Sequence, residues 1–211
     1  MTLRSALTCL VVASACIPVA VSAQDAAVGS TQAASAGQTE GSIDDAALRA
    51  MTTACLPAIT GMIDTTDSSA AAETLSQAGY ISVERPDPLL RMMAPKGSPA
   101  LYFGQDTDKG RVSLALAQDR PFCTLALTGI DSSQSTAEAV AAHFASDGVP
   151  FEKSGDRKIA NGQMTSADYD WRVDARRSIG ARVMRPLVTL PKGKDFLLIT
   201  MFVSNSDTTE N

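Results

Sequence analysis

The two carboxylates of the sequence DYDW are the first residues that could do chemistry. Asp168 and Asp170 stand two residues apart, so on a β-strand both side chains lie on one face. Two such carboxylates can share a cation or flank a glycosidic bond as acid and base. They can instead pair with arginines on a neighbouring strand. Both roles are open, and the many arginines nearby favour the pairing.

Basic residues gather immediately beyond these aspartates. Between Arg172 and Lys194 there are seven basic residues and a single acid, Asp174, in a chain of formal net charge −5. Such an excess can attract an anionic partner, or it can be a solvated face that nearby aspartates neutralise. We predict a surface for an anionic envelope component or an acidic protein, formed by Arg172, Arg176, Arg177, Arg182 and Arg185. Nucleic acid is not an expected partner, because the chain is acidic and Trp171 is the only aromatic residue among these basic residues.

Cys55 and Cys123 are the next candidates. Leu48, Met51, Cys55, Ile59 and Met62 recur at spacings of three and four, which is typical of a helix stripe that faces the core. Pro57 is expected to kink or restart that helix. In FCTLALT the alternation places Cys123 on the same buried strand face as two leucines. A catalytic thiolate would need a base or a cation beside the sulfur, whereas two cysteines of an exported chain most often pair. We predict a Cys55–Cys123 disulfide.

Other chemical motifs are incomplete. His143 is the only histidine, so a multi-histidine metal site is excluded. The sequence contains no nucleophile elbow, phosphate-binding loop or dinucleotide fingerprint. The stretch GQDTDKG lacks the spacing of a calcium loop and is predicted to be a hairpin turn. We therefore expect no metal and no cofactor. A non-catalytic binding or accessory protein is favoured; the alternative is a histidine-independent hydrolase that acts on an envelope glycan through Asp and Glu carboxylates.

The N-terminal residues predict export. Residues 1–23 have the pattern of a cleavable signal peptide, with Arg4, an apolar run and small residues before Gln24. The run is too short, and too interrupted by Pro18, to be a membrane span. The expected location is therefore the periplasm or the medium. Alternatively, Cys16 follows Ala-Ser-Ala and could be the lipid-modified residue of an anchored lipoprotein.

The remaining chain predicts a single α+β domain. Residues 24–42 are expected to form a flexible tail, 43–203 the domain and 204–211 a frayed C-terminal tail. Helices are expected at 43–62, 68–78 and 134–147. Short apolar segments between turns predict strands, with 89–94 among them and with 149–153 and 156–160 as two separate strands.

Connections this short favour an antiparallel sheet, flanked here by about three helices. Both the second and the third helix are expected to end at a glycine, Gly79 and Gly148, and strands follow each of them. The domain could therefore be a duplicated helix-plus-sheet unit. The sequence carries no signal for an oligomeric state.

Overall fold

The computed structural model describes residues 42–205. The predicted signal sequence 1–23, the alternative lipid site Cys16, most of the N-terminal tail and residues 206–211 lie outside this range. The elements are α1 (Ile43–Ala50), the π-helical turn η1 (Met51–Cys55), α2 (Leu56–Ile59), α3 (Ser68–Gln77), β1 (Ile81–Ser82), α4 (Pro88–Met93), β2 (Ala100–Thr107), β3 (Gly110–Ala117), β4 (Phe122–Ile130), α5 (Ser133–Phe144), β5 (Glu152–Ile159), η2 (Ala160–Gly162), β6 (Met164–Arg172), β7 (Arg177–Pro186) and β8 (Asp195–Asn205).

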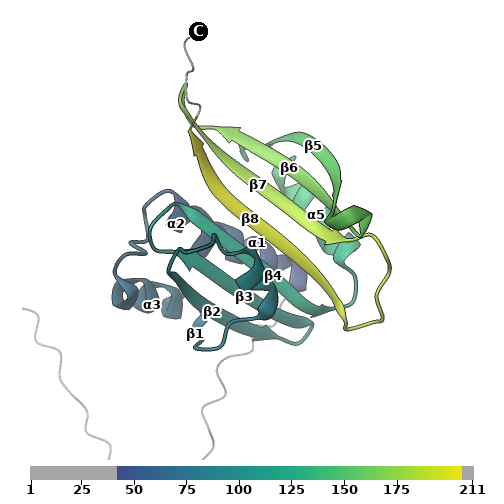
Figure 1. Cartoon of the computed structure of the whole chain (residues 1–211), viewed down its shortest axis with the longest axis horizontal. Coiled ribbons are helices and arrows are strands. Elements are labelled where there is room, and N and C mark those ends of the chain that lie inside the picture. The colour runs from purple at the N-terminus through teal and green to yellow at the C-terminus, as the bar shows by residue number, and fades with distance from the viewer. Residues whose placement is uncertain (1–41, 206–211) are drawn as a thin grey trace, which may run out of the picture. The chain divides into compact units, whose positions relative to one another are not determined.

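All eight strands form one antiparallel sheet, in the order β1-β2-β3-β4-β8-β7-β6-β5. Each half is a meander of four strands, and the halves meet where β4 pairs with β8 (Figure 1). The mixed α+β class and the antiparallel sheet are confirmed. A glycine with positive φ follows both α3 and α5, Gly79 at +88° and Gly148 at +85°. The duplication of a helix-plus-sheet unit stays a prediction.

The two faces of the sheet are covered differently. One face carries fully buried leucines such as Leu114, Leu125 and Leu197, and α1 packs there on β3 and β4 while α5 packs on β7 and β8. We call this the helix-covered face; in Figure 1, α1 and α5 lie behind the sheet. The opposite face carries Thr124 and Arg182, and only α4 packs on it among the described elements. We call it the open face.

The first helix accommodates Pro57 by widening rather than by ending. Pro57 has no N–H, and in a regular helix its ring would clash with the carbonyl four residues earlier. The turn η1 has the i→i+5 pattern of a π-bulge, in which the Leu56 N–H donates to the Met51 carbonyl. The helix then continues through α2 to Ile59. Met62 lies beyond this end, and its 81% exposure contradicts its predicted place in the buried stripe.

The segment 89–94 is a helix, so the predicted strand there is wrong. The Asp87 carboxylate accepts a hydrogen bond from the Leu89 N–H at 2.8 Å, and Pro88 occupies the first helical position, where its missing N–H costs nothing. Leu90 of α4 then packs on Ala115 and Ala126 of the open face. The two strands expected at 149–153 and 156–160 are one strand, β5, with an irregularity between Lys153 and Gly155.

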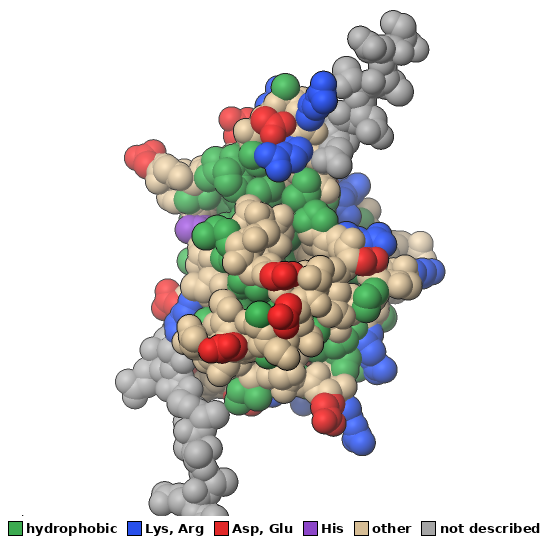
Figure 2. All heavy atoms as spheres, turned by 90° about the vertical axis from the view of Figure 1, so that its left-hand side faces the viewer, with side chains coloured by type: hydrophobic (Ala, Val, Ile, Leu, Met, Phe, Trp, Pro, Cys, Tyr) green, Lys and Arg blue, Asp and Glu red, His purple; other side chains and the backbone are tan. Residues whose placement is uncertain are grey.

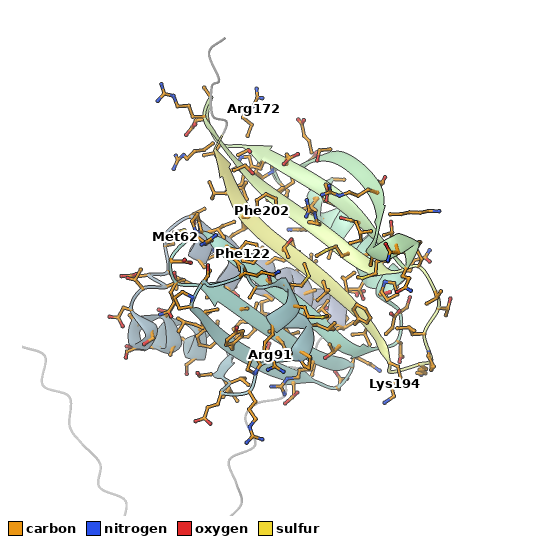
Figure 3. All side chains as sticks on the ribbon, in the orientation of Figure 1. Met62, Arg91, Phe122, Arg172, Lys194 and Phe202 are labelled. Carbon is orange, nitrogen blue, oxygen red and sulfur yellow. A yellow bond between two sulfur atoms is a disulfide. The ribbon has the colours of Figure 1, made fainter. Side chains whose placement is uncertain are left out.

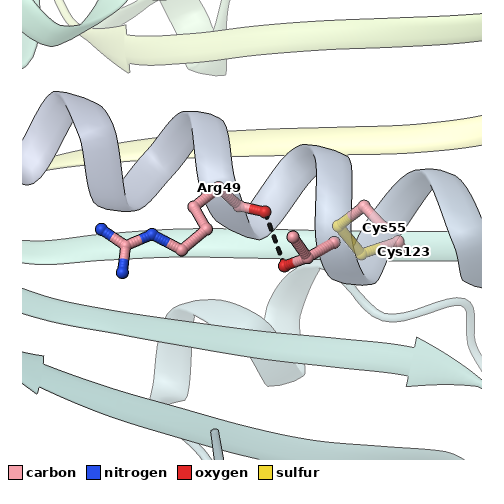
Figure 4. The surroundings of a disulfide bond; sticks show 4 residues. Arg49, Cys55 and Cys123 are labelled. Atoms are coloured by element: carbon pink, nitrogen blue, oxygen red, sulfur yellow. Dashed lines mark hydrogen bonds between the residues drawn. A yellow bond between two sulfur atoms is a disulfide. The ribbon is translucent and has the colours of Figure 1, made fainter. Parts of the chain in front are cut away.

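The disulfide between Cys55 and Cys123 is present, as predicted. Both residues are fully buried, and their Cα atoms are 5.3 Å apart. Cys55 ends η1, and Cys123 is the second residue of β4, so the bond ties the first helix to the middle of the sheet (Figure 4). In the same helix the Thr53 hydroxyl donates to the Arg49 carbonyl at 2.8 Å, which satisfies an oxygen next to the π-helical turn.

Candidate functional site

The β6–β7 hairpin brings three of the five predicted arginines together. β6 ends at Arg172 and β7 begins at Arg177. Between them the Asp174 carboxylate accepts hydrogen bonds from the Arg176 and Arg177 N–H groups, both at 2.8 Å. This closes a tight turn and places Arg172, Arg176 and Arg177 at one exposed end of the sheet, where Figure 3 shows Arg172. We call these three residues the hairpin arginines.

Only one of the hairpin arginines is paired. Arg177 Nε lies 2.9 Å from Asp174 Oδ2. The pKa of Asp174 is lowered, first by the hydrogen bond from the Arg176 backbone and then by the Arg177 side chain. Arg172 and Arg176 make no ion pair within residues 42–205. Two exposed guanidinium groups therefore remain available at this end of the sheet.

Arg182 lies on the open face, where Asp168 neutralises it. The two residues are directly opposite in the β6–β7 register, and Arg182 Nε donates to Asp168 Oδ1 at 2.9 Å. Arg157 Nη2 lies 2.7 Å from the other carboxylate oxygen, and the Ser166 hydroxyl donates to Oδ1 at 3.0 Å. Asp168 is thus used by three donors, which confirms the favoured cross-strand pairing for this residue and leaves it unsuited to an acid–base pair. Asp170, the other predicted member, makes no ion pair within residues 42–205.

Arg185 lies on the helix-covered face, away from the other four. It is three residues beyond Arg182 on the same strand, and an odd spacing reverses the face. Arg185 lines a cavity of about 200 Å³ between α5 and β5–β7, with Glu138 and Tyr169 also in its wall. Burial raises the pKa of Tyr169. The five predicted arginines therefore occupy three separate places.

A cleft of about 940 Å³ opens beside the hairpin arginines. The beginning of β5, the end of β6 and the beginning of β7 form it, and it brings together Asp170, Arg172 and Arg177, which the sequence had singled out. Its full lining is Pro150, Glu152, Lys153, Ser154, Asp170, Trp171, Arg172, Asp174, Arg177 and Ser178. Three acids and three bases line it, so the cleft is polar and of mixed charge.

Glu152, which no pattern in the sequence singles out, faces Asp170 across the β5–β6 pair. Directly opposite residues of an antiparallel pair have Cβ atoms about 4.5–5.5 Å apart. Neither carboxylate has an ion-pair partner in the described part of the chain. No local motif indicates this pair, because the residues are distant in sequence and the irregularity in β5 sets the register.

An aromatic cluster holds the end of β6 beside this cleft. The Trp171 ring contacts Phe151 edge-on, with centroids 5.9 Å apart. The ring centroid of Phe144, on α5, lies 4.7 Å from the ring centroids of both Phe151 and Tyr169. Trp171 is half-buried and is one of the residues that line the cleft. His143, next to Phe144, is half-buried on α5 and lines none of the cavities described in this section.

Charge is divided between the two sides of the molecule. The helix-bearing segments 42–80 and 131–148 contain eight acidic residues and one basic residue, Arg49. The remaining described segments contain 16 basic and 11 acidic residues. In Figure 2, acidic side chains lie on the face toward the viewer, and many Lys and Arg side chains lie along the right-hand margin. The sheet and α4 therefore form the basic side of the molecule.

No group of three or more His, Cys, Asp or Glu side chains within 42–205 is placed to hold a metal ion. No helix in this range is long and apolar enough to cross a membrane.

Comparison of the chain with protein-family models, with curated proteins and with solved structures found no match.

Proposed function

We propose that the chain is an exported, disulfide-bonded protein that binds an anionic component of the cell envelope and performs no chemistry. The observation that carries this proposal is the pair of unpaired guanidinium groups, Arg172 and Arg176, on the basic side of a molecule whose helix layer is acidic. Such a charge distribution attracts and orients the protein toward an anionic surface.

Export is supported by the Cys55–Cys123 bond and by the signal pattern of residues 1–23. Disulfides form and persist in oxidising compartments such as the periplasm. We propose cleavage before Gln24, with lipid attachment at Cys16 as the alternative. The intact mass of the protein from an exporting host decides between them, because a lipidated Cys16 would add the mass of a diacylglyceryl group.

The binding proposal predicts a specific role for the hairpin. A basic residue close to an anionic lipid surface contributes about 1 kcal/mol. Replacing Arg172 and Arg176 with Gln should therefore weaken binding by about 2 kcal/mol, or about thirtyfold. Co-sedimentation with vesicles of phosphatidylglycerol and phosphatidylcholine measures this effect. Salt at about 1 M, where the Debye length is about 3 Å, should abolish the binding of the unchanged protein.

A matched control separates a local site from net charge. Lys158 and Arg185 belong to the helix-covered face of the same half, and replacing both with Gln changes the net charge by the same amount. We expect this control to bind vesicles almost as well as the unchanged protein. Equal losses in both double variants would contradict a hairpin site. If the protein binds an acidic protein but does not bind vesicles, its partner is a protein and not an anionic envelope component.

One observation favours a second candidate, a glycan hydrolase. Glu152 and Asp170 face each other in a cleft that also presents Trp171. Retaining glycosidases use two carboxyl groups about 5–5.5 Å apart, one as nucleophile and the other as acid and base. Under this candidate, Glu152→Gln or Asp170→Asn would each abolish release of reducing ends from peptidoglycan. Under the binding proposal, the unchanged protein releases none.

A further inference from the structure

A second, smaller cavity lies on the open face at the other half of the sheet. Its volume is about 240 Å³, and it lies between the connection from β1 to α4 and the strands β2 and β3. Its lining is Val83, Arg85, Pro86, Asp87, Pro88, Leu90, Tyr102, Phe103, Arg111 and Ser113. None of these residues belongs to the cleft beside the hairpin.

Arg111 is the best-positioned cation of this cavity. Arg111 and Asp106 are directly opposite each other in the β2–β3 register. The Arg111 Nη1 group donates a hydrogen bond to Asp106 Oδ1 at 2.7 Å. The guanidinium also lies against Gly104, because a Cβ atom at that position would be only 2.6 Å from Nη2. The absence of a side chain at Gly104 and the pairing with Asp106 together fix the orientation of the guanidinium.

Most of the hydrogen-bonding capacity of Arg111 remains free. A guanidinium has five N–H donors, and the contacts of the described residues use one of them. Arg85 supplies a second cation and has no ion pair in the described part of the chain. The one acid in the lining, Asp87, already accepts the Leu89 N–H at 2.8 Å. The polar end of the cavity is therefore suited to an anion.

The rest of the wall is apolar. Val83, Leu90 and the Tyr102 ring line the cavity together with two prolines. Leu90 is 1% exposed and packed against the sheet, so this wall is preformed. Ser113 lies two residues beyond Arg111 on β3, so its side chain is on the same face of the sheet. It is 4% exposed and adds a hydroxyl group to the cavity wall. A ligand that fits must join an anionic group to a compact apolar body.

We propose that this cavity binds a small amphipathic carboxylate. The carboxylate accepts paired hydrogen bonds from Arg111, the geometry in which guanidinium groups recognise carboxylates most strongly, and Arg85 closes the site from the opposite wall. The apolar body lies against Val83, Leu90 and Tyr102. A volume of about 240 Å³ equals that of about eight water molecules, which limits the part of the ligand inside the cavity to roughly eight to ten non-hydrogen atoms.

Two sources share this chemistry, a free short-chain acid and the C-terminal carboxylate of a peptide with an apolar last residue. The experiment titrates the full protein with three probes and follows binding by isothermal calorimetry and amide chemical shifts. Hexanoate represents the free acid, acetyl-glycyl-leucine the peptide terminus, and hexanamide is the uncharged control. We expect hexanoate to bind at least tenfold more tightly than hexanamide. Tighter binding of the acetylated dipeptide than of hexanoate would assign the site to peptide ends.

Variants locate the binding at this cavity. Arg111→Gln should weaken hexanoate binding at least tenfold. Gly104→Ala retains every charge but displaces the Arg111 guanidinium, so it should weaken hexanoate binding as well. If Arg111→Gln does not fold, Gly104→Ala tests whether hexanoate binds at this cavity. Arg120→Gln is the matched control, because Arg120 is also paired with an aspartate and is similarly exposed, 51% against 40% for Arg111, but lines no part of the cavity.

The proposal is overturned if hexanoate fails to bind, if hexanamide binds equally well, or if folded Arg111→Gln and Gly104→Ala variants both bind like the unchanged protein. These outcomes are independent of vesicle binding, since the hairpin arginines contact no part of this cavity.

Discussion

Removing the disulfide should destabilise the domain more than any other single change described here. Cys55 and Cys123 close a loop with a sequence separation of 68. Loop-closure entropy in the unfolded chain then corresponds to about 4 kcal/mol at 25 °C. For a domain of this size each kcal/mol shifts the melting temperature by about 2–4 °C, so reduction should lower it by roughly 8–16 °C.

Urea unfolding of the oxidised and the reduced protein measures this loss and its origin. If the bond acts through the unfolded state, the reduced chain exposes more surface on unfolding than the oxidised chain. The free energy of unfolding of the reduced protein should then fall more steeply with urea concentration. The double variant Cys55→Ala, Cys123→Ala should lose somewhat more than the reduced protein, because both sulfur atoms are fully buried and their removal leaves a cavity.

Two results would refute this reasoning. A loss of less than about 1 kcal/mol on reduction would show that the constraint on the unfolded chain is not significant. Full labelling of both thiols in the native protein, purified from an oxidising compartment, would show that the bond is not formed there.

Three further changes test the packing and the hydrogen bonds of the fold. Asp195→Ala should cost about 1–3 kcal/mol in urea unfolding, because the buried carboxylate accepts the Ser133 N–H at 2.7 Å; an unchanged stability would contradict this role. Gly180→Ala should cost about 1 kcal/mol, since a Cβ atom there would lie 2.6 Å from the Phe202 ring, and the cost should vanish in a Phe202→Ala background. The Asp174 carboxyl, followed by its NMR shift, should titrate below its ordinary value of 3.8. Its stabilising hydrogen bonds are therefore present above that value and are lost as the pH falls through the lower folded pKa; a midpoint at or above 3.8 would exclude them.

Strand faces could be predicted from the sequence because side-chain alternation is a local property. The pattern of FCTLALT placed Cys123, Leu125 and Leu127 on one buried face, and all three are fully buried on the helix-covered face. The spacing of apolar residues by three and four is equally local, and it located the first helix and α5. Neither periodicity needs knowledge of the remaining fold, which explains why these predictions are confirmed.

Local patterns failed where two periodicities compete or where pairing is distant. The apolar run of 89–94 predicts a strand, although Asp87 and Pro88 before it form a recognisable helix start. Glu152 could not be found at all, because its position opposite Asp170 depends on a register that includes an irregular step in β5. A pairing of this kind requires the three-dimensional fold.

The basic run of the sequence shows how strand geometry redistributes charge. Arg182 and Arg185 are three residues apart on β7, and an odd spacing sends them to opposite faces of the sheet. Arg182 is further compensated by Asp168, so neither contributes a free charge to the hairpin. Arg172 and Arg177 instead stand at the facing ends of β6 and β7, and Arg176 lies in the turn between them, so these three arginines gather at one end of the sheet. Binding to an anionic surface should therefore depend on Arg172 and Arg176 and be insensitive to Arg185, although all three belong to one basic run in the sequence.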